Sequence, residues 1–156
     1  MNLPDPAAFL RNVVTSPSYW SAGILWSVLA DAQATGGSYP TRATLSERTA
    51  GPMHVHHNPD EVFYILEGRA VFQLGETRQE GGPGDLISIP RGTPHGFESL
   101  TDELRVLNWY TPVGFERLIV ETGIPTTTLT LPPRFLPEPD PAQTERIISE
   151  IGMSLC

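Results

Sequence analysis

Short strand-like runs separated by turn residues dominate the middle of this 156-residue chain. Residues 61–67 form a β-branched and aromatic run that Gly68 ends, and residues 86–89 form an apolar run that Pro90 ends. Similar short runs lie at residues 24–29, 70–74, 95–99 and 104–110. Several short strands at close spacing, with glycine and proline between them, are typical of β-sandwiches and barrels. The pattern therefore predicts an all-β fold in one domain, because a chain of this length suits a single core.

The two ends of the chain have a different character from the middle. We assign residues 1–20 to an N-terminal arm, residues 21–111 to the barrel, and residues 112–156 to a C-terminal segment that packs on the barrel or on a partner subunit. Within that last segment, a stretch rich in proline and threonine at residues 125–139 excludes regular helix. A final helix is predicted to begin at Pro141, since proline suits the first turn of a helix. The predicted fold is thus all-β with short C-terminal helices.

The composition of the chain excludes several classes of function. Its net charge of −8 argues against binding to nucleic acid, whose phosphates need clustered cations. Its basic side chains are arginines, so neither the lysine of a pyridoxal Schiff base nor that of a P-loop is available. Cys156 is the only cysteine, which leaves no internal disulfide. We expect a cytoplasmic protein with no membrane partner, because no apolar run could span a bilayer and no leader pattern begins the chain.

All four histidines lie in two short segments of the chain. Side chains two apart on a strand share a face, so His54 and His56 point the same way, whereas His57 faces the other way as a surface residue. A short turn lets Glu61 return from the next strand toward the first two imidazoles, and His95 begins a later strand. Imidazole nitrogens and a carboxylate oxygen suit one divalent transition metal ion, either Fe, Mn, Ni, Co, Cu or Zn. The alternative is a barrel of the same fold that binds no metal.

The spacing of these residues resembles that of the two motifs of the cupin superfamily. The first motif is matched by His54 and His56 with one residue between them, then four residues, Glu61, six residues and Gly68. The second motif is matched by residues 84–95, which have glycine at the start, a Pro-x-Gly step in the middle and histidine at the end. The pair of motifs is more specific than either alone and covers about a third of the chain.

The cupin resemblance implies both a fold and a ligand set. The fold is a double-stranded β-helix, the cupin jelly roll. Two positions depart from the family pattern: Gly51 lies two residues before the first histidine instead of five, and Ser99 stands where the family has asparagine. Residues 18–26 and 112–116 are further similar to single-domain cupins of the quercetin-dioxygenase-like kind. The implied metal ligands are His54, His56, Glu61 and His95.

Seven further side chains are candidates for a substrate pocket above the metal. Phe63, Ile65 and Phe97 share strand parity with Glu61 or His95, so they should face the barrel interior. Phe72, Trp26 and Trp109 could line the mouth of the barrel, and Met53, next to the first ligand, could touch a substrate. The alternative for any one of these residues is plain core packing.

The resemblance implies a metal-dependent enzyme, and we expect its substrate to be a small aromatic, polyphenolic or polyketide-like molecule. A redox-active metal would allow dioxygenase-type oxidation with dioxygen as co-substrate, and Glu61 could act as a catalytic general base. With zinc, the same ligands would give a non-redox cyclase or isomerase. The remaining alternative is a non-enzymatic cupin that binds a small ligand. Exposed strand edges must be covered or paired, which favours a homodimer.

Overall fold

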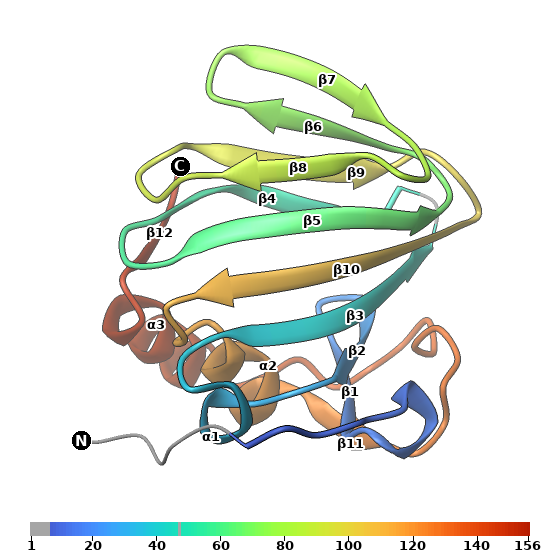
Figure 1. The fold of residues 1–156 in the computed structure, drawn as a ribbon. Coiled ribbons are helices and arrows are strands. Elements are labelled where there is room, and N and C mark those ends of the chain that lie inside the picture. The colour runs from blue at the N-terminus through green and yellow to red at the C-terminus, as the bar shows by residue number, and fades with distance from the viewer. Residues whose placement is uncertain (1–6, 47) are drawn as a thin grey trace.

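The structure is a computed structural model that describes residues 7–46 and 48–156 and contains two antiparallel β-sheets (Figure 1). The larger sheet has the strand order β11 (Ile124–Thr126), β1 (Ser18–Ser21), β2 (Ile24–Val28), β3 (Tyr39–Ser46), β10 (Glu103–Thr111), β5 (Asp60–Glu67), β8 (Leu86–Ile89). The smaller sheet has the order β12 (Met153–Leu155), β4 (Ala50–His56), β9 (His95–Ser99), β6 (Ala70–Leu74), β7 (Thr77–Gly81). The helices are η1 (Val13–Thr15), α1 (Ala32–Thr35), α2 (Glu116–Thr122) and α3 (Pro141–Glu150). The prediction of an all-β fold with short C-terminal helices is confirmed.

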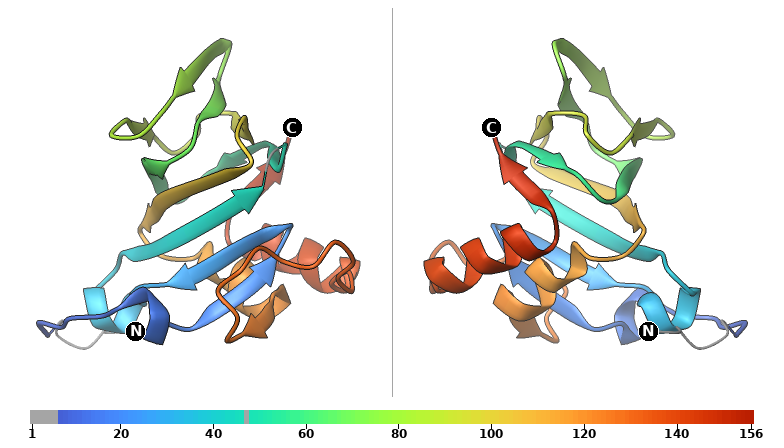
Figure 2. Two further views of the ribbon diagram at one scale, coloured as in Figure 1. Left: turned by 90° about the vertical axis from the view of Figure 1, so that its right-hand side faces the viewer. Right: turned by 90° about the vertical axis from the view of Figure 1, so that its left-hand side faces the viewer.

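The chain passes back and forth between the two sheets from β3 onward. Strands β3, β5, β8 and β10 belong to the larger sheet, whereas β4, β6, β7 and β9 belong to the smaller one. Figure 2 shows the β6–β7 hairpin at one end of the molecule and helices α2 and α3 at the other. The alternation between sheets is a jelly roll, and it brings β9 close to β4 and β5 although β9 lies far from them along the chain.

The core lies between the two sheets and is built from the inward-facing residues of successive strands. On β10, Leu104 and Val106 are buried, whereas Arg105 and Leu107 on the other face are partly exposed. Such alternation is expected of a strand that has one face on a core. The buried apolar cluster consists of Ile24, Trp26, Ala43, Leu45, Phe63, Ile65, Ala70, Phe72, Ile89, Leu104, Val106 and Ile119.

The ends of the chain pack against the sheets. Residues 18–20, which the sequence places in the N-terminal arm, pair within β1 with both β2 and β11. Helix α3 begins at Pro141 as predicted, and the Asp140 side chain accepts a hydrogen bond from the backbone N–H of Ala142. That bond satisfies one of the backbone donors left free at the start of a helix.

Strand β12 follows α3 and lies beside β4 at the edge of the smaller sheet. Leu155 is paired with His54, and Met153 is paired with His56. The last strand of the chain therefore borders the strand that carries two of the predicted metal ligands. Among the described residues, the helices are all too short or too polar to cross a membrane.

Candidate metal centre

Strand β4 carries two histidines on its inner face. His54 and His56 are 7% and 3% exposed, whereas the residue between them is turned to the other face and partly exposed. Just before them, the pairing of β4 with β9 is irregular between Gly51 and His54. A Cβ atom on Gly51 would lie 2.6 Å from the Phe97 ring, so glycine lets this ring pack closely against the strand. The Gly51 position, which departs from the family spacing, thus makes room for an aromatic side chain next to the histidines.

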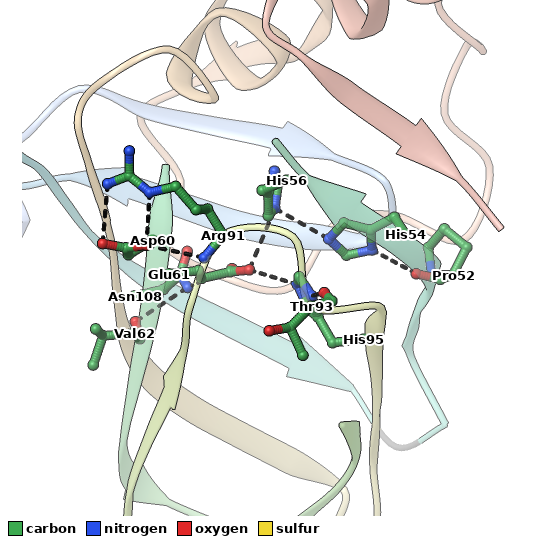
Figure 3. Close-up of polar contacts among 10 residues, drawn as sticks. All are labelled: Pro52, His54, His56, Asp60, Glu61, Val62, Arg91, Thr93, His95 and Asn108. Carbon is green, nitrogen blue, oxygen red and sulfur yellow. Dashed lines mark hydrogen bonds and ion pairs between the residues drawn. The ribbon is translucent and has the colours of Figure 1, made fainter. Parts of the chain in front are cut away.

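Glu61 of β5 and His95 of β9 complete a cluster of four buried side chains (Figure 3). Oε2 of Glu61 lies 2.8 Å from Nε2 of His95 and 3.3 Å from Nε2 of His56. Nε2 of His56 lies 3.1 Å from Nε2 of His54. One potential ligand atom from each residue lies within 4.8 Å of all the others. The structure therefore brings together the four residues that the sequence names as ligands.

Backbone carbonyl groups orient two of the three imidazoles. Nδ1 of His54 donates to the carbonyl oxygen of Pro52 at 2.6 Å, and Nδ1 of His95 donates to that of Thr93 at 2.8 Å. A histidine whose Nδ1 carries a proton presents Nε2 as its ligand atom, and such a carbonyl partner also fixes the plane of the ring. Both rings therefore aim Nε2 at the centre of the cluster.

Burial and mutual hydrogen bonds set the charge of the centre. Burial lowers the pKa of His54 to about 4, so this imidazole is neutral near neutral pH. Burial opposes ionisation of Glu61, but hydrogen bonds from His56 and His95 outweigh it and hold the pKa of this carboxyl well below its usual range. Burial also opposes a charge on His95, yet its hydrogen bond to Glu61 raises its pKa overall. The result is an ionised carboxylate facing imidazole nitrogens in a dry site.

The donor set fits one divalent transition metal. Metal–nitrogen bonds of about 2.0–2.1 Å place adjacent ligand atoms about 2.9 Å apart at right angles and about 3.4 Å apart in a tetrahedron. The separations of 2.8, 3.1 and 3.3 Å along the cluster match adjacent ligand positions of this kind. His54, His56, Glu61 and His95 are therefore able to hold a metal ion, with the proton that His95 shares with Glu61 displaced on binding.

Three residues of the site were missed by sequence reasoning. Asn108 of β10 is fully buried and donates from Nδ2 to Oε1 of Glu61 at 2.9 Å. The Tyr110 ring lies edge-on to His56 at 5.5 Å, and burial together with the adjacent Glu61 carboxylate raises the pKa of its phenol well above the usual value. Phe115 stacks on Tyr110 with ring centres 4.4 Å apart. The sequence could have indicated Asn108 and Tyr110, because they follow Leu104 and Val106 at intervals of two residues and so share the inward face of the same strand.

Six of the seven predicted pocket residues lie in three different places: a cluster of aromatic rings in the core, the side of the core near Phe115, and a groove. The rings of Phe63, Phe72 and Phe97 form one cluster with centres 5.4, 5.4 and 6.1 Å apart, and Ile65 is buried in the same core. Trp26 lies on another side, where its ring centre is 6.3 Å from that of Phe115. Met53 lines a groove of about 190 Å³ together with Val71, Gln73, Arg78 and Gly96.

Trp109 is not brought to the cluster. It follows Asn108 on β10 and so belongs to the opposite, partly exposed face of that strand, because successive side chains of a strand alternate. His57 also points away from the centre, as its parity predicts: its side chain is exposed, and its Nε2 lies 2.8 Å from Oγ of Ser154. Ser99, which replaces the family asparagine, is buried and donates to the carbonyl oxygen of Thr101 at 3.1 Å.

The sequence of the central strands matches a known family. Residues 41–110 match the family model described as a cupin domain. An acireductone dioxygenase from Exiguobacterium sibiricum is 40% identical over 57 residues, which are 33% of this chain and 31% of that protein. A quercetin 2,3-dioxygenase from Bacillus subtilis is 27% identical over 84 residues, which are 53% of this chain and 25% of that protein. The matched segments span between 25% and 53% of the lengths of the curated relatives.

The fold matches solved structures as well. An RmlC-like cupin from Shewanella frigidimarina aligns with a TM-score of 0.61 at 15% identity, over 69% of this chain and 93% of that chain. At this identity, the likeness concerns the fold. The matched family segment contains each of the four converging side chains, and the two sheets form the same jelly roll. Residues 41–110 of this chain therefore match a cupin domain both in sequence and in fold.

Proposed function

We propose that this chain is a metal-dependent enzyme that oxidises a small aromatic, polyphenolic or polyketide-like molecule in a dioxygenase-type reaction. The observation that carries the proposal is the convergence of four buried ligand atoms within 4.8 Å, from His54, His56, Glu61 and His95. The similarity to an acireductone dioxygenase and to a quercetin 2,3-dioxygenase supports an oxidative reaction.

The residues of the centre would hold the metal, and one of them would accept a proton from the substrate. A bound Fe, Mn, Ni, Co or Cu ion would supply Lewis-acid polarisation of substrate oxygens and access to dioxygen chemistry. All three imidazoles present Nε2 to the centre, two of them in rings that backbone carbonyl groups orient, and Glu61 offers an ionised carboxylate. Because that carboxylate is ionised at neutral pH, it would be suited to accept the proton of a substrate hydroxyl if a substrate oxygen took its place on the metal. The burial of all four side chains keeps bulk water from this proton.

A cavity of about 410 Å³ between β6, β7 and β8 is our candidate for the substrate site. Its apolar wall includes Phe72, Leu74 and Ile87, and Leu74 is paired with His95 across β6 and β9. Carboxylates rather than cations border it, namely those of Glu80 and Asp85. These carboxylates favour an uncharged molecule over a substrate that is itself a carboxylate or a phosphate.

A non-redox cyclase or isomerase that uses zinc is the second candidate. The specific observation in its favour is the donor set, since three imidazole nitrogens and one carboxylate oxygen are ligands that zinc accepts in tetrahedral sites. A non-enzymatic cupin that binds a small ligand is the third candidate, and it would need no metal in the centre.

We further propose that the protein is cytoplasmic. We propose the N-terminal arm at residues 1–20, the barrel at residues 21–111 and the C-terminal segment at residues 112–156. We also propose that two copies of the chain form a homodimer. The outer face of the larger sheet supports the dimer, because the paired side chains of Tyr64 and Leu86 are 36% and 58% exposed and Leu66 beside them is 42% exposed. Apolar side chains gathered on one sheet face are typical of an interface. Light scattering on purified protein measures the mass in solution, and a mass equal to that of one chain would contradict the dimer.

Elemental analysis of protein purified without added metals or chelators is the first test of the proposed function. We expect about one divalent metal ion per chain in the wild-type protein. His54→Ala and His95→Ala should lose this metal while keeping the β-rich circular dichroism of the fold. His57→Ala is the matched control, because this exposed histidine lies in the same segment and should leave the metal content unchanged. A full metal content in both ligand variants would contradict the proposed ligand set.

Oxygen uptake then separates the oxidative reaction from the alternatives. With quercetin as the probe for a polyphenolic substrate, we expect its disappearance to be coupled to consumption of dioxygen in an oxygen electrode. Turnover of the same probe under strict anaerobiosis would overturn the dioxygenase proposal in favour of the non-redox reaction. Binding of the probe without turnover by metal-loaded protein would favour the binding module.

A further inference from the structure

The two oxygens of the Glu61 carboxylate have different partners. Oε2 faces the imidazoles of His56 and His95, whereas Oε1 accepts a hydrogen bond of 2.9 Å from Nδ2 of Asn108 (Figure 3). Nδ2 of Asn108 also lies 3.4 Å from the carbonyl oxygen of Val62. Because Glu61 and Asn108 are both fully or almost fully buried, no bulk water competes for this bond. The carboxylate is therefore held with one oxygen toward the centre and the other turned away from it.

The orientation of the Asn108 amide follows from its neighbours. Both groups next to Nδ2 are acceptors, namely the carboxylate of Glu61 and the carbonyl of Val62. A flipped amide would place Oδ1 against two oxygens, with no donor among them. The bond to Oε1 is thus a charge-assisted bond from a neutral donor, which stabilises the ionised carboxylate without cancelling its charge.

Packing alone does not account for an amide at this position. Leu104 and Val106 fill the two preceding inward positions of β10, and an apolar residue at position 108 would continue the core. Within the described part of the chain, Oδ1 of Asn108 has no hydrogen-bond partner although it is buried. A buried acceptor without a partner is destabilising, a cost that leucine would avoid. The gain that offsets this cost lies at Nδ2, on the carboxylate of Glu61.

We propose that Asn108 is a positioning residue that makes Glu61 a ligand through Oε2 alone, an inference that rests on the proposed metal-binding function. By holding Oε1, the amide prevents the carboxylate from turning both oxygens toward the ion. It also keeps the ionised carboxylate in place when no metal is bound. Asn108 is not one of the four converging side chains, and it acts through its bond to Glu61.

Cobalt(II) is the probe for this role, because its visible spectrum reports the number of ligands and its affinity can be measured by competition with a chelator. Asn108→Leu keeps the number and branching of the side-chain heavy atoms but removes the donor. We expect its cobalt affinity to fall about 10–100-fold, as is typical when the partner of a metal ligand is lost. We also expect a weaker visible absorption, because a carboxylate that binds through both oxygens raises the coordination number.

Ser27→Ala is the matched control. Ser27 is also fully buried and polar, but it bonds Ser18 at 3.0 Å in the β1–β2 pair, outside the set of residues that make up the metal centre. Its cobalt affinity and spectrum should equal those of the wild-type protein even if its melting temperature falls. Should Asn108→Leu fail to fold, Asn108→Ala, which cannot overfill the site, is measured in the same way.

The outcomes separate this inference from the proposed function. If the wild-type protein binds cobalt and the Asn108 variants bind it with the same affinity and spectrum, Asn108 has only a structural role and the inference is overturned, while the metal site stands. If the wild-type protein binds no cobalt, the metal site itself is wrong and the inference falls with it. Weaker affinity with a changed spectrum in the Asn108 variants alone supports the positioning role.

Discussion

Asp60 and Glu61 are consecutive carboxylates on β5, yet their surroundings are opposite (Figure 3). The Asp60 side chain is about half exposed and accepts two bonds of 3.1 Å from the Arg91 guanidinium and one of 2.9 Å from its backbone N–H. Hydrogen bonds from Arg91 lower the pKa of Asp60 to about 2. Glu61 is buried, which opposes its ionisation, and its pKa is nevertheless low because of hydrogen bonds from His56 and His95.

The difference teaches that a low carboxyl pKa does not by itself identify a functional site. Asp60 has a complete partner, because one guanidinium occupies both of its oxygens in an exposed ion pair. Glu61 shares one oxygen between two imidazoles that belong to different strands, and within residues 7–46 and 48–156 no arginine forms an ion pair with it. Burying such a charge is expensive unless several groups converge on it, and that convergence marks a candidate site.

Removing the charge of each carboxylate should produce the largest contrast. We expect Glu61→Gln to weaken cobalt binding by more than about 100-fold, since loss of a ligand exceeds the loss of a ligand's partner. Asp60→Asn changes the neighbouring residue in the same way, yet it should alter the cobalt affinity by less than about threefold, because exposed ion pairs couple weakly to their surroundings. Chelator competition measures both affinities. Equal losses in the two variants would break the distinction between the faces of β5.

The pH dependence of metal binding should show a second, smaller contrast. Glu61 raises the pKa of His95, so below this raised pKa a metal ion must displace one proton from His95. We expect the cobalt affinity to fall about tenfold per pH unit on the acid side of that pKa. His54 should add no further proton until the pH nears about 4. Titrations between neutral and mildly acid pH measure the slope, and an affinity independent of pH in this range would contradict the coupling of His95 to Glu61.

The resemblance to the second cupin motif placed His95 in the ligand set, although it lies 34 residues beyond Glu61, whereas local geometry already placed the other three ligands close together. The spacing of His54 and His56 fixes a shared face on one strand, and the turn before Glu61 fixes its return. The glycines and prolines that interrupt the apolar runs likewise predicted the short strands, and Pro141 predicted the start of α3. In each of these local cases, the information lies within a few residues of chain, where parity and turn chemistry determine the geometry.

The residues that surround the ligands depend on pairing between distant strands, which the sequence does not state. Asn108 meets Glu61 across 47 residues of chain because β10 pairs with β5 in a particular register. One step along the same strand, Trp109 faces away, although its aromatic character favoured a place in the pocket. The pairing of β12 with β4 is equally non-local. Assigning parity along β10 from Val106 would have separated Asn108 from Trp109 without knowledge of the register.

Asp60, the exposed carboxylate of the two neighbours on β5, allows the prediction with the smallest expected effect. The pKa of Asp60 in the folded chain is about 2, below its ordinary value of 3.8, so the ion pair with Arg91 contributes to stability above that ordinary value. This contribution is lost as the pH falls through about 2, where Asp60 is protonated in both the folded and the unfolded chain. We therefore expect Arg91→Gln to lower the melting temperature only slightly at neutral pH, and the difference from wild type to shrink below about pH 4. Thermal unfolding followed by circular dichroism at a series of pH values measures this difference. A difference that instead grew toward acid pH would mean that Arg91 stabilises the fold through a group other than the Asp60 carboxylate. The contrast between an ordinary ion pair at Asp60 and a candidate site at Glu61 would then no longer hold.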